Sequence, residues 1–199
     1  PNADTYSSLN GYNADLSSIS IGNTGEGYRT SVVSNRRRFV ANVKSINDKG
    51  QTVVQSDRLM YSEINRFDTF PPTNFIDIGV NDGEDFVKIE SYADRLLAYK
   101  NRTLYVINVG GGSDTQWFLE SEHKNMGVDF HAAVVKTDFG VAWVNKNGLY
   151  FYDGSQIRNL QSKVLESEWT SFVNDDTIIG YEPTHKHLVI VRDAAASGG

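Results

Sequence analysis

The feature that most constrains the fold is a pattern that the chain repeats after about 44 residues. Residues 94–109 read DRLLAYKNRTLYVINV, and residues 140–154 read GVAWVNKNGLYFYDG. Each stretch has two nearly continuous apolar runs with a short polar break, which is typical of a hairpin of strands buried on both faces. The small side chains of Ala98 and Ala142 stand at matching positions of the two runs and are expected to let neighbouring units approach closely. The repetition indicates a repeating structural unit.

Further predicted strands surround these hairpins and group into blocks of four. One block covers residues 86–122 and a second covers residues 130–161, with other strands in residues 31–64 and 175–193. A helical pattern is confined to residues 161–173. Four-stranded units of about 40 to 50 residues are typical of the blades of a β-propeller. The sequence therefore predicts an all-β fold, a β-propeller-like array of four-stranded antiparallel blades.

The predicted blades do not add up to a closed ring. They number about three and a half, whereas closed propellers have about four to eight. We therefore expect either a segment of a larger propeller or an open arc of blades. Residues 1–27 are predicted to be an extended Ser- and Asn-rich arm or loop, residues 28–193 the blades, and residues 194–199 a flexible tail. The arm has few aliphatic residues, so we expect a partner to order it.

The apolar runs also predict which side chains form the core. Trp143, Tyr150 and Tyr152 lie in central strands and are expected to be buried. Trp117 and Trp169 lie nearer the ends of their blocks and are candidates for exposed positions. The predicted core consists of Leu96, Leu97, Tyr99, Leu104, Val106, Val141, Trp143, Leu149 and Phe151.

Composition excludes several classes of function. The 199 residues include 19 basic and 25 acidic ones, which gives a net charge of −6, whereas a dedicated nucleic-acid-binding domain usually has a basic excess. Cysteine is absent, so disulfides and thiolate metal sites are excluded. No apolar run approaches the roughly 20 residues of a transmembrane helix, so we expect no membrane span.

Three polar clusters are candidates for binding sites, and each also has a structural explanation. Residues 36–38, RRR, have the charge to contact DNA phosphate, but alternation along a strand sends neighbouring side chains to opposite faces. Residues 81–85, NDGED, offer oxygen ligands for Ca²⁺ without the spacing of an EF-hand loop. His185 and His187 alternate on one predicted strand, and together with Glu182 they have the ligand types for Zn²⁺ or Ni²⁺. We favour solvated or interfacial arginines, a polar turn and a surface strand, and we predict no metal site and no cofactor.

The residue patterns give little support for catalysis. The sequence has no nucleophile elbow, no phosphate-binding P-loop and no HExxH motif. Glu120 and Glu122 share a predicted strand face, as a glycosidase pair would, and Glu166 and Glu168 lie in the predicted helix. Because paired carboxylates are common on an acidic surface, we predict that the protein is not an enzyme and has no catalytic residues.

Several motifs resemble a known family in their order and spacing. They are TSVVSNRRRFVANV at residues 30–43, DRLMYSEINRFDTFPP at 57–72, IDIGVNDGE at 76–84, ADRLLAYK at 93–100 with LYVIN at 104–108, and GVAWVNKNGLYFYDG at 140–154. Together they resemble the predicted propeller-type virion proteins of tailed bacteriophages. The resemblance covers residues 28–160.

This resemblance implies a structural component of a bacteriophage virion, such as the tail nozzle or an adaptor ring of short-tailed phages. It implies a homo-oligomeric ring around the tail axis, other tail or adaptor proteins as partners, and at most transient contact with passing DNA. It places the protein in the virion after assembly in the cytoplasm of the bacterial host. The arm and a proline-containing loop, residues 67–75, are the predicted contacts.

The alternative is a tail-fibre or spike propeller that binds or hydrolyses carbohydrate on the host surface. A sugar-binding propeller would be expected to repeat an exposed aromatic residue at one position of each blade. The sequence does not repeat one, which favours the structural role.

Overall fold

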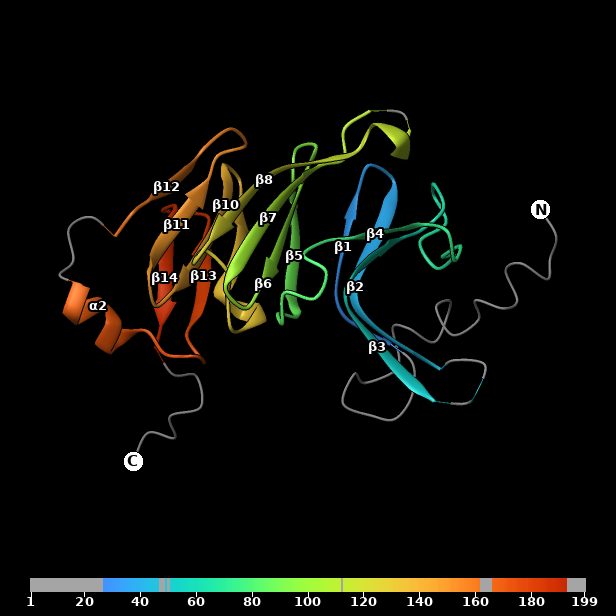
Figure 1. The fold of residues 1–199 in the computed structure, drawn as a ribbon. Helices are drawn as coiled ribbons and strands as arrows, with labels where there is room; N and C mark the ends of the chain where they lie inside the picture. Colours follow the sequence, from blue (N-terminus) through green and yellow to red (C-terminus); the bar gives the residue numbers. More distant parts are fainter. Residues whose placement is uncertain (1–26, 47–48, 50, 112, 162–165, 193–199) are drawn as a thin grey trace. The chain divides into compact units, whose positions relative to one another are not determined.

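The computed structural model describes residues 27–46, 49, 51–111, 113–161 and 166–192 (Figure 1). In these ranges the fold is all-β, as predicted, with antiparallel sheets of four, four, four and two strands. The chain divides into two compact units, Pro1–Ser91 and Tyr92–Gly199. In the part of the chain that the structure describes, no helix has the length and apolar character needed to cross a membrane.

The first unit is built on a four-stranded sheet whose strands follow one another in sequence order. The β1–β2 turn has φ values of 47° at Asn35 and 61° at Arg36, the left-handed conformation that a two-residue type I′ hairpin requires at both positions. Beside this sheet lies β5 (Phe86–Tyr92), whose Ile89 amide donates to Thr30 Oγ1 at 3.0 Å. The sheet consists of β1 (Gly27–Ser34), β2 (Arg37–Ile46), β3 (Thr52–Tyr61) and β4 (Phe75–Asp77).

A bulge bends this sheet at Asn42. Val43 pairs with Gln55 but Ala41 pairs with Leu59, so residues 56–58 of β3 lie opposite Asn42 alone. Asn42 has a φ of 55° and is buried, and its Nδ2 donates to the carbonyl oxygen of Phe86 at 3.2 Å. Asparagine suits this position because it tolerates the left-handed conformation and supplies the hydrogen bond.

Two substitutions separate these two contributions of Asn42. We expect Asn42→Ala to lower the free energy of unfolding by about 2 kcal/mol, because it combines a strained backbone with a lost hydrogen bond. Asn42→Gly removes the strain and should cost about 1 kcal/mol less than the alanine variant. Urea unfolding of the two variants measures the difference. Equal losses would show that the backbone conformation contributes nothing.

The second unit contains the two hairpins that carry the sequence repeat. Strands β6, β7 and β8 form a sheet of order β5-β6-β7-β8, in which all of β5 except Tyr92 belongs to the first unit. A second sheet has the order β9-β10-β11-β12, and β13 and β14 form a two-stranded sheet. The strands are β6 (Arg95–Lys100), β7 (Thr103–Asn108), β8 (Phe118–Lys124), β9 (Val134–Thr137), β10 (Gly140–Asn145), β11 (Gly148–Tyr152), β12 (Ile157–Asn159), β13 (Ile178–Glu182) and β14 (His187–Val191). The connections include the 3-10 turns η3 (Asp114–Gln116) and η4 (His131–Ala133) and the helix α2 (Glu166–Phe172).

The structural repeat between the hairpins is 45 residues, one more than the pattern suggested. Both β6 and β7 begin 45 residues before β10 and β11, respectively. Ala98, three residues into β6, is therefore equivalent to Trp143 and not to Ala142. The prediction that Ala98 and Ala142 match is wrong, although both are fully buried. Apolar runs buried on both faces lack the alternation that fixes register, so a one-residue error leaves no sign in the sequence.

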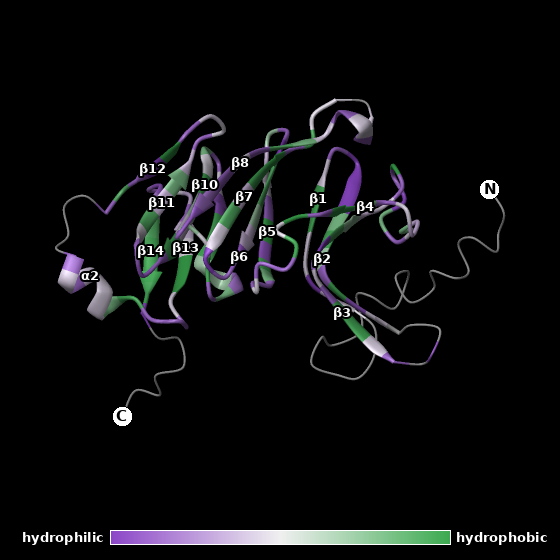
Figure 2. Cartoon of the chain, in the orientation of Figure 1, coloured by the Kyte–Doolittle hydropathy of each residue, from purple (hydrophilic) through white to green (hydrophobic). Residues whose placement is uncertain are grey.

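The core of the second unit largely follows the prediction. In Figure 2 hydrophobic residues follow strands such as β7, β13 and β14, and the connections are mainly hydrophilic. Leu149 and Phe151 were predicted to be core but are only half-buried, because they lie on the face of β11 opposite to Tyr150 and Tyr152. The predicted core residues that are buried are Leu96, Leu97, Tyr99, Leu104, Val106, Val141 and Trp143.

Trp169 connects α2 to the repeat. It was a candidate for an exposed position, but it is only 6% exposed, and its Nε1 donates to the carbonyl oxygen of Asn145 at 3.0 Å. The expectation was wrong because the helix lies against the turn between β10 and β11, a contact between residues 24 positions apart. Trp117, the other candidate, is half-buried.

Candidate functional site

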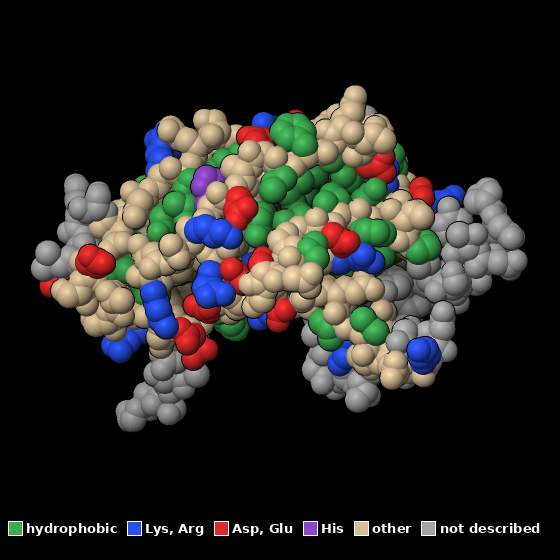
Figure 3. Space-filling view, in the orientation of Figure 1, with side chains coloured by type: hydrophobic (Ala, Val, Ile, Leu, Met, Phe, Trp, Pro, Cys, Tyr) green, Lys and Arg blue, Asp and Glu red, His purple; other side chains and the backbone are tan. Residues whose placement is uncertain are grey.

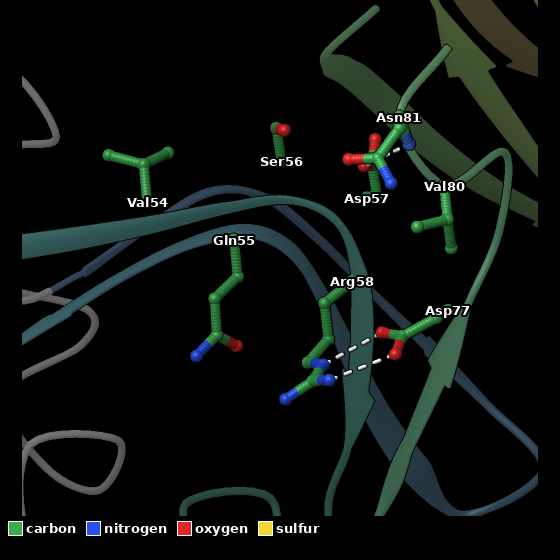
Figure 4. Close-up of a pocket in the computed structure, with 8 residues that line it drawn as sticks. All are labelled: Val54, Gln55, Ser56, Asp57, Arg58, Asp77, Val80 and Asn81. Carbon is green, nitrogen blue, oxygen red and sulfur yellow. Dashed lines mark hydrogen bonds and ion pairs between the residues drawn. The ribbon is translucent and has the colours of Figure 1, made fainter. Parts of the chain in front are cut away.

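An open polar pocket lies beside the bend of β3 in the first unit (Figure 4). Its volume is about 430 Å³. Eight residues from β3, β4 and the loop after β4 line it: Val54, Gln55, Ser56, Asp57, Arg58, Asp77, Val80 and Asn81.

The pocket lies where β3 extends beyond the end of β4. Strand β4 pairs with β3 only from Arg58 to Met60, so β3 continues past the end of β4. The loop after β4 then closes one side, because the Ile78 amide donates to the carbonyl oxygen of Asp57 and the Asn81 amide donates to Asp57 Oδ2, both at 3.0 Å. Backbone and side chain of Asp57 thus fix the loop on β3.

Arg58 and Asp77 form the best-defined contact of the pocket. The guanidinium donates from Nε to Asp77 Oδ1 at 2.7 Å and from Nη2 to Oδ2 at 2.9 Å, the bidentate geometry that Figure 4 shows. The guanidinium carbon also lies 3.7 Å from the centre of the Phe75 ring. Arg58 is therefore oriented by two groups before any ligand arrives.

The remaining lining suits a neutral polar ligand. Ser56 and Asn81 carry uncharged hydrogen-bonding groups, and Val54 and Val80 are more than half exposed beside them. The Oε1 atom of Gln55 is buried without a hydrogen-bond partner among the described residues. The pocket combines hydrogen-bonding groups with apolar contact area and contains no histidine, and cysteine is absent from the whole chain. Its lining suits binding better than nucleophilic catalysis.

The Arg58–Asp77 pair should contribute little to stability. Both side chains are about a third exposed, so we expect Asp77→Asn to lower the free energy of unfolding by no more than about 1 kcal/mol. The loss should shrink further in about 1 M salt, where the Debye length is about 3 Å. Urea unfolding at low and high salt measures both effects. A loss several times larger at both salt concentrations would show that the pair supports the sheet itself.

The three arginines of the sequence motif point in different directions. Arg36 is exposed in the β1–β2 turn. The Arg37 guanidinium lies 5.3 Å from the centre of the Tyr61 ring and donates to the carbonyl oxygen of Ser62 at 2.7 Å. Arg38 lies 5.0 Å from the centre of the Tyr28 ring and donates to the Tyr28 hydroxyl. The side chains of Arg37 and Arg38 are thus occupied by aromatic partners on alternate faces of β2, as the alternation predicted.

Residues 81–85 form a turn and do not converge on one point. Asp82 Oδ1 accepts from the Glu84 amide at 2.9 Å, Glu84 is buried, and Asp85 is exposed. Asn81 lines the pocket instead. Among the residues that the structure describes, no group of three or more His, Asp or Glu side chains is placed to hold a metal ion.

His185 and His187 are not on the same strand, which corrects the prediction. His185 lies in the turn after β13, and His187 begins β14, although their rings stack with centres 5.7 Å apart. Glu182 Oε2 accepts from the His185 amide at 2.6 Å and lies 3.1 Å from His185 Nδ1. These hydrogen bonds, led by the one from the His185 amide, lower the pKa of the Glu182 carboxyl. The carboxylate closes the turn.

The glutamates proposed as a catalytic pair each have a cation beside them. Glu120 accepts from Arg95 Nε at 2.9 Å, and Glu122 pairs with Lys124. The register of β7 and β8 shifts between Val106 and Ile107, so Glu120 is an extra residue and the alternation that joined the two glutamates is interrupted. Glu166 and Glu168 are exposed two positions apart on α2, where side chains do not face each other.

One perturbed carboxyl was not predicted. Asp129 is exposed as a residue, but partial desolvation of its carboxyl, with a smaller contribution from the charge of Asp175, raises the pKa of that carboxyl, and Lys146 acts in the opposite direction. Lys146 Nζ lies 2.5 Å from Asp175 Oδ1. Sequence spacing gives no signal for this cluster, because its members come from three separate connections of the second unit.

Comparison with known proteins gives no matching family model and no matching curated protein. The class of the protein is therefore given by its fold alone: it is an all-β protein of repeated antiparallel sheets.

Proposed function

We propose that the protein is a structural component of a bacteriophage virion, a subunit of a tail nozzle or adaptor ring whose sheets are propeller-like blades. The proposal rests mainly on what the residues of the phage-like motifs do in the structure. In the structure they make contacts that hold the sheets and turns together. Motif residues that support the fold, and do not line a reaction site, are expected in a family of structural proteins.

The motif residues of the first unit fasten the end of its sheet. Arg58 binds Asp77 across β3 and β4. Ser62 Oγ accepts from the Arg38 amide at 2.9 Å, which ties the end of β3 to β2. Phe70, from the proline-containing loop, is 1% exposed and packs in a cluster with Val40, Val43 and Met60. These contacts account for the spacing of the motif.

The motif residues of the second unit fix its turns. Asn145 Oδ1 accepts from the amides of Asn147 and Gly148, which forms the β10–β11 turn. Asp153 Oδ1 accepts from two amides after β11. Asn108, which lies one repeat before Asp153, has the same role at the end of β7, where its Oδ1 accepts from the Gly110 amide. Recurrent turns of the same chemistry support a tandem array of blades.

The sheet topology supports the propeller-like arrangement. Each of the three larger sheets is a simple meander of four antiparallel strands in sequence order, the organisation of a propeller blade. The two-stranded sheet of β13 and β14 begins a fourth unit with the same order. Repeated blades of this kind are rigid spacers, which suits a component of a tail that must transmit force and enclose a channel.

Charge supports a passage through which DNA slides. The net charge is −6, and basic side chains such as Arg95, Lys146 and Arg158 are paired with carboxylates. On the face that Figure 3 shows, acidic and basic side chains lie next to one another and do not form a patch of one sign. Such a surface binds phosphate weakly, so contact with passing DNA is transient. Other tail proteins and further copies of the chain are the partners in this proposal.

Cryo-electron microscopy of virions of the phage that encodes the chain tests this function. The expected result is density for these sheets in several copies around the tail axis. Density for single copies at fibre tips, or absence of the protein from the particle, would overturn the proposal.

A second candidate function, binding of a host-surface saccharide, is favoured by the pocket at β3. Its uncharged hydrogen-bonding groups beside exposed valines match what a sugar ring presents. A glycan array with the full chain and with Asn81→Ala separates the two functions. Binding that Asn81→Ala removes would support the saccharide site, and absence of binding leaves the structural role as the better account.

A further inference from the structure

The turn between β10 and β11 contains the residue pair Asn147–Gly148. The sequence has two such Asn–Gly pairs, and the other, Asn10–Gly11, lies outside the described residues. Asparagine before glycine is prone to lose its side-chain amide, because glycine has no Cβ atom to keep its nitrogen away from the asparagine Cγ. Asn147 is exposed, so water reaches its side chain. The pair is therefore a candidate for spontaneous deamidation.

The packing of the turn requires the glycine of this pair. Gly148 is buried and pairs with Asn145 across the hairpin. A Cβ atom at Gly148 would lie 3.0 Å from Asn159 Nδ2 and 3.1 Å from Tyr150 Cζ, closer than most Cβ atoms approach their neighbours. A larger residue would therefore have to displace these side chains. The susceptible pair is a consequence of close packing.

Two hydrogen bonds restrain the groups that would react. The Gly148 amide donates to Asn145 Oδ1 at 3.1 Å, and Asn147 Nδ2 donates to the carbonyl oxygen of Asn125 at 3.0 Å. The first bond holds the proton that must leave before the Gly148 nitrogen can attack. The second fixes the side-chain amide that must turn toward this nitrogen. The reaction must therefore wait until the turn opens.

We propose that Asn147 is a site of spontaneous deamidation, which the hydrogen bonds of the folded turn hold back. When the turn opens, the Gly148 nitrogen loses its proton and attacks Asn147 Cγ. The bond from Cγ to Nδ2 breaks, the amide nitrogen leaves as ammonia with that proton, and a succinimide ring remains. Water then opens the ring at either of its carbonyl groups. The product is aspartate or isoaspartate at position 147.

Either product weakens the turn. A carboxylate at position 147 has acceptors only, so the hydrogen bond to the Asn125 carbonyl is lost. Isoaspartate also lengthens the main chain by a methylene group, in a turn whose ends pair at Asn145 and Gly148. The carbonyl oxygen of Asn145 accepts from Trp169 Nε1, so distortion of the turn loosens α2. Deamidation thus releases the helix that the intact turn holds.

Incubation of the full-length protein at neutral pH, followed by peptide mapping, tests the proposal. Trypsin releases residues 147–158, in which Asn147 is the single asparagine. Mass spectrometry detects the exchange of an amide for a carboxyl group, and fragment spectra place it at position 147. The modified peptide should accumulate at least about tenfold more slowly in the folded chain than in guanidinium chloride, where the restraining hydrogen bonds are absent.

Two variants separate opening of the turn from unfolding of the chain. Asn145→Ala removes the acceptor of the Gly148 amide, so Asn147 should deamidate at least about tenfold faster than in the unchanged chain. The control Asn42→Ala lowers stability in the first unit and leaves the turn intact, so its rate should stay within about twofold of the unchanged chain. If Asn145→Ala does not fold, the unchanged chain in sub-denaturing guanidinium chloride replaces it. The rate should then rise in proportion to hydrogen exchange of the Gly148 amide.

The effect on α2 has its own measurement. Deamidation adds a negative charge, so ion exchange separates the modified chain, and peptide mapping identifies the fraction altered at position 147. Hydrogen exchange of the Trp169 indole N–H should be faster in this fraction, because its acceptor, the Asn145 carbonyl, lies in the altered turn. Equal exchange rates in the modified and unmodified fractions would contradict the release of α2.

Three results would overturn the deamidation site itself. Equal rates in the folded and unfolded chain would show that the turn gives no protection. Equal acceleration in Asn145→Ala and Asn42→Ala would show that the reaction proceeds through unfolding of the chain. Absence of a carboxyl group at position 147 even in the unfolded chain would show that the pair is unreactive. None of these results depends on the proposed virion function, which microscopy of the particle tests separately.

Discussion

Replacement of Trp143 by alanine is expected to lower the free energy of unfolding by about 3–5 kcal/mol. The indole is fully buried in β10, the central strand on which the sequence repeat is centred. Its ring centre lies 5.4 Å from that of Tyr99 in an edge-on arrangement and 5.5 Å from that of Tyr150 in a stacked one. Alanine leaves a cavity between the rings of Tyr99 on β6 and Tyr150 on β11, and rigid strands cannot collapse into it.

Two further variants show whether burial is the cause. Trp143→Phe keeps an aromatic ring and removes an indole N–H that has no hydrogen-bond partner among the described residues, so it should cost less than half as much. Phe118→Ala removes an aromatic side chain that is 54% exposed and should cost less than about 1 kcal/mol. Urea unfolding followed by circular dichroism, with an unchanged m-value, measures all three. A loss below about 1 kcal/mol for Trp143→Ala would contradict the burial.

The strands of the second unit could be predicted from sequence because local signals agree there. Strand β10 is a nearly continuous apolar run that ends at Asn145, and a two-residue turn returns the chain to β11. Strand propensity, length and turn chemistry all favour the same hairpin. Register was the exception. In runs buried on both faces a shift of one residue changes no pattern, so Ala98 was paired with the wrong residue of the second hairpin.

The pocket could not be predicted, because it depends on contacts between distant residues. Arg58 and Asp77 are 19 residues apart and meet because β4 returns to pair with β3, which puts the two residues opposite each other. Nothing in the sequence around Asn42 marks a bulge. The burial of Trp169 has the same origin, since a short helix shows no preferred partner until the turn after β10 is in place.

The second large effect is expected at Asn145, where alanine should lower the free energy of unfolding by about 2–4 kcal/mol. The side chain is 9% exposed and makes four hydrogen bonds. Its Nδ2 donates to the carbonyl oxygens of Asn125 at 3.1 Å and Gly127 at 2.7 Å, while Oδ1 accepts from the amides of Asn147 and Gly148. Alanine removes the side-chain partner of two buried bonds, those to the Gly127 carbonyl and the Gly148 amide, and of two part-buried ones. Each buried group left unpaired costs about 1–3 kcal/mol before relaxation and water reduce the sum.

The neighbouring Asn147 provides a matched control. It is exposed in the same turn, and its Nδ2 donates only to the carbonyl oxygen of Asn125, at 3.0 Å. Asn147→Ala should therefore cost less than about 1 kcal/mol. The backbone carbonyl of Asn145 also accepts from Trp169 Nε1, so loss of the turn geometry should loosen α2 as well. Hydrogen exchange of the Trp169 indole N–H reports this: faster exchange in Asn145→Ala than in Asn147→Ala is the expected result, and equal rates would show that the side chain of Asn145 does not position the turn for the helix.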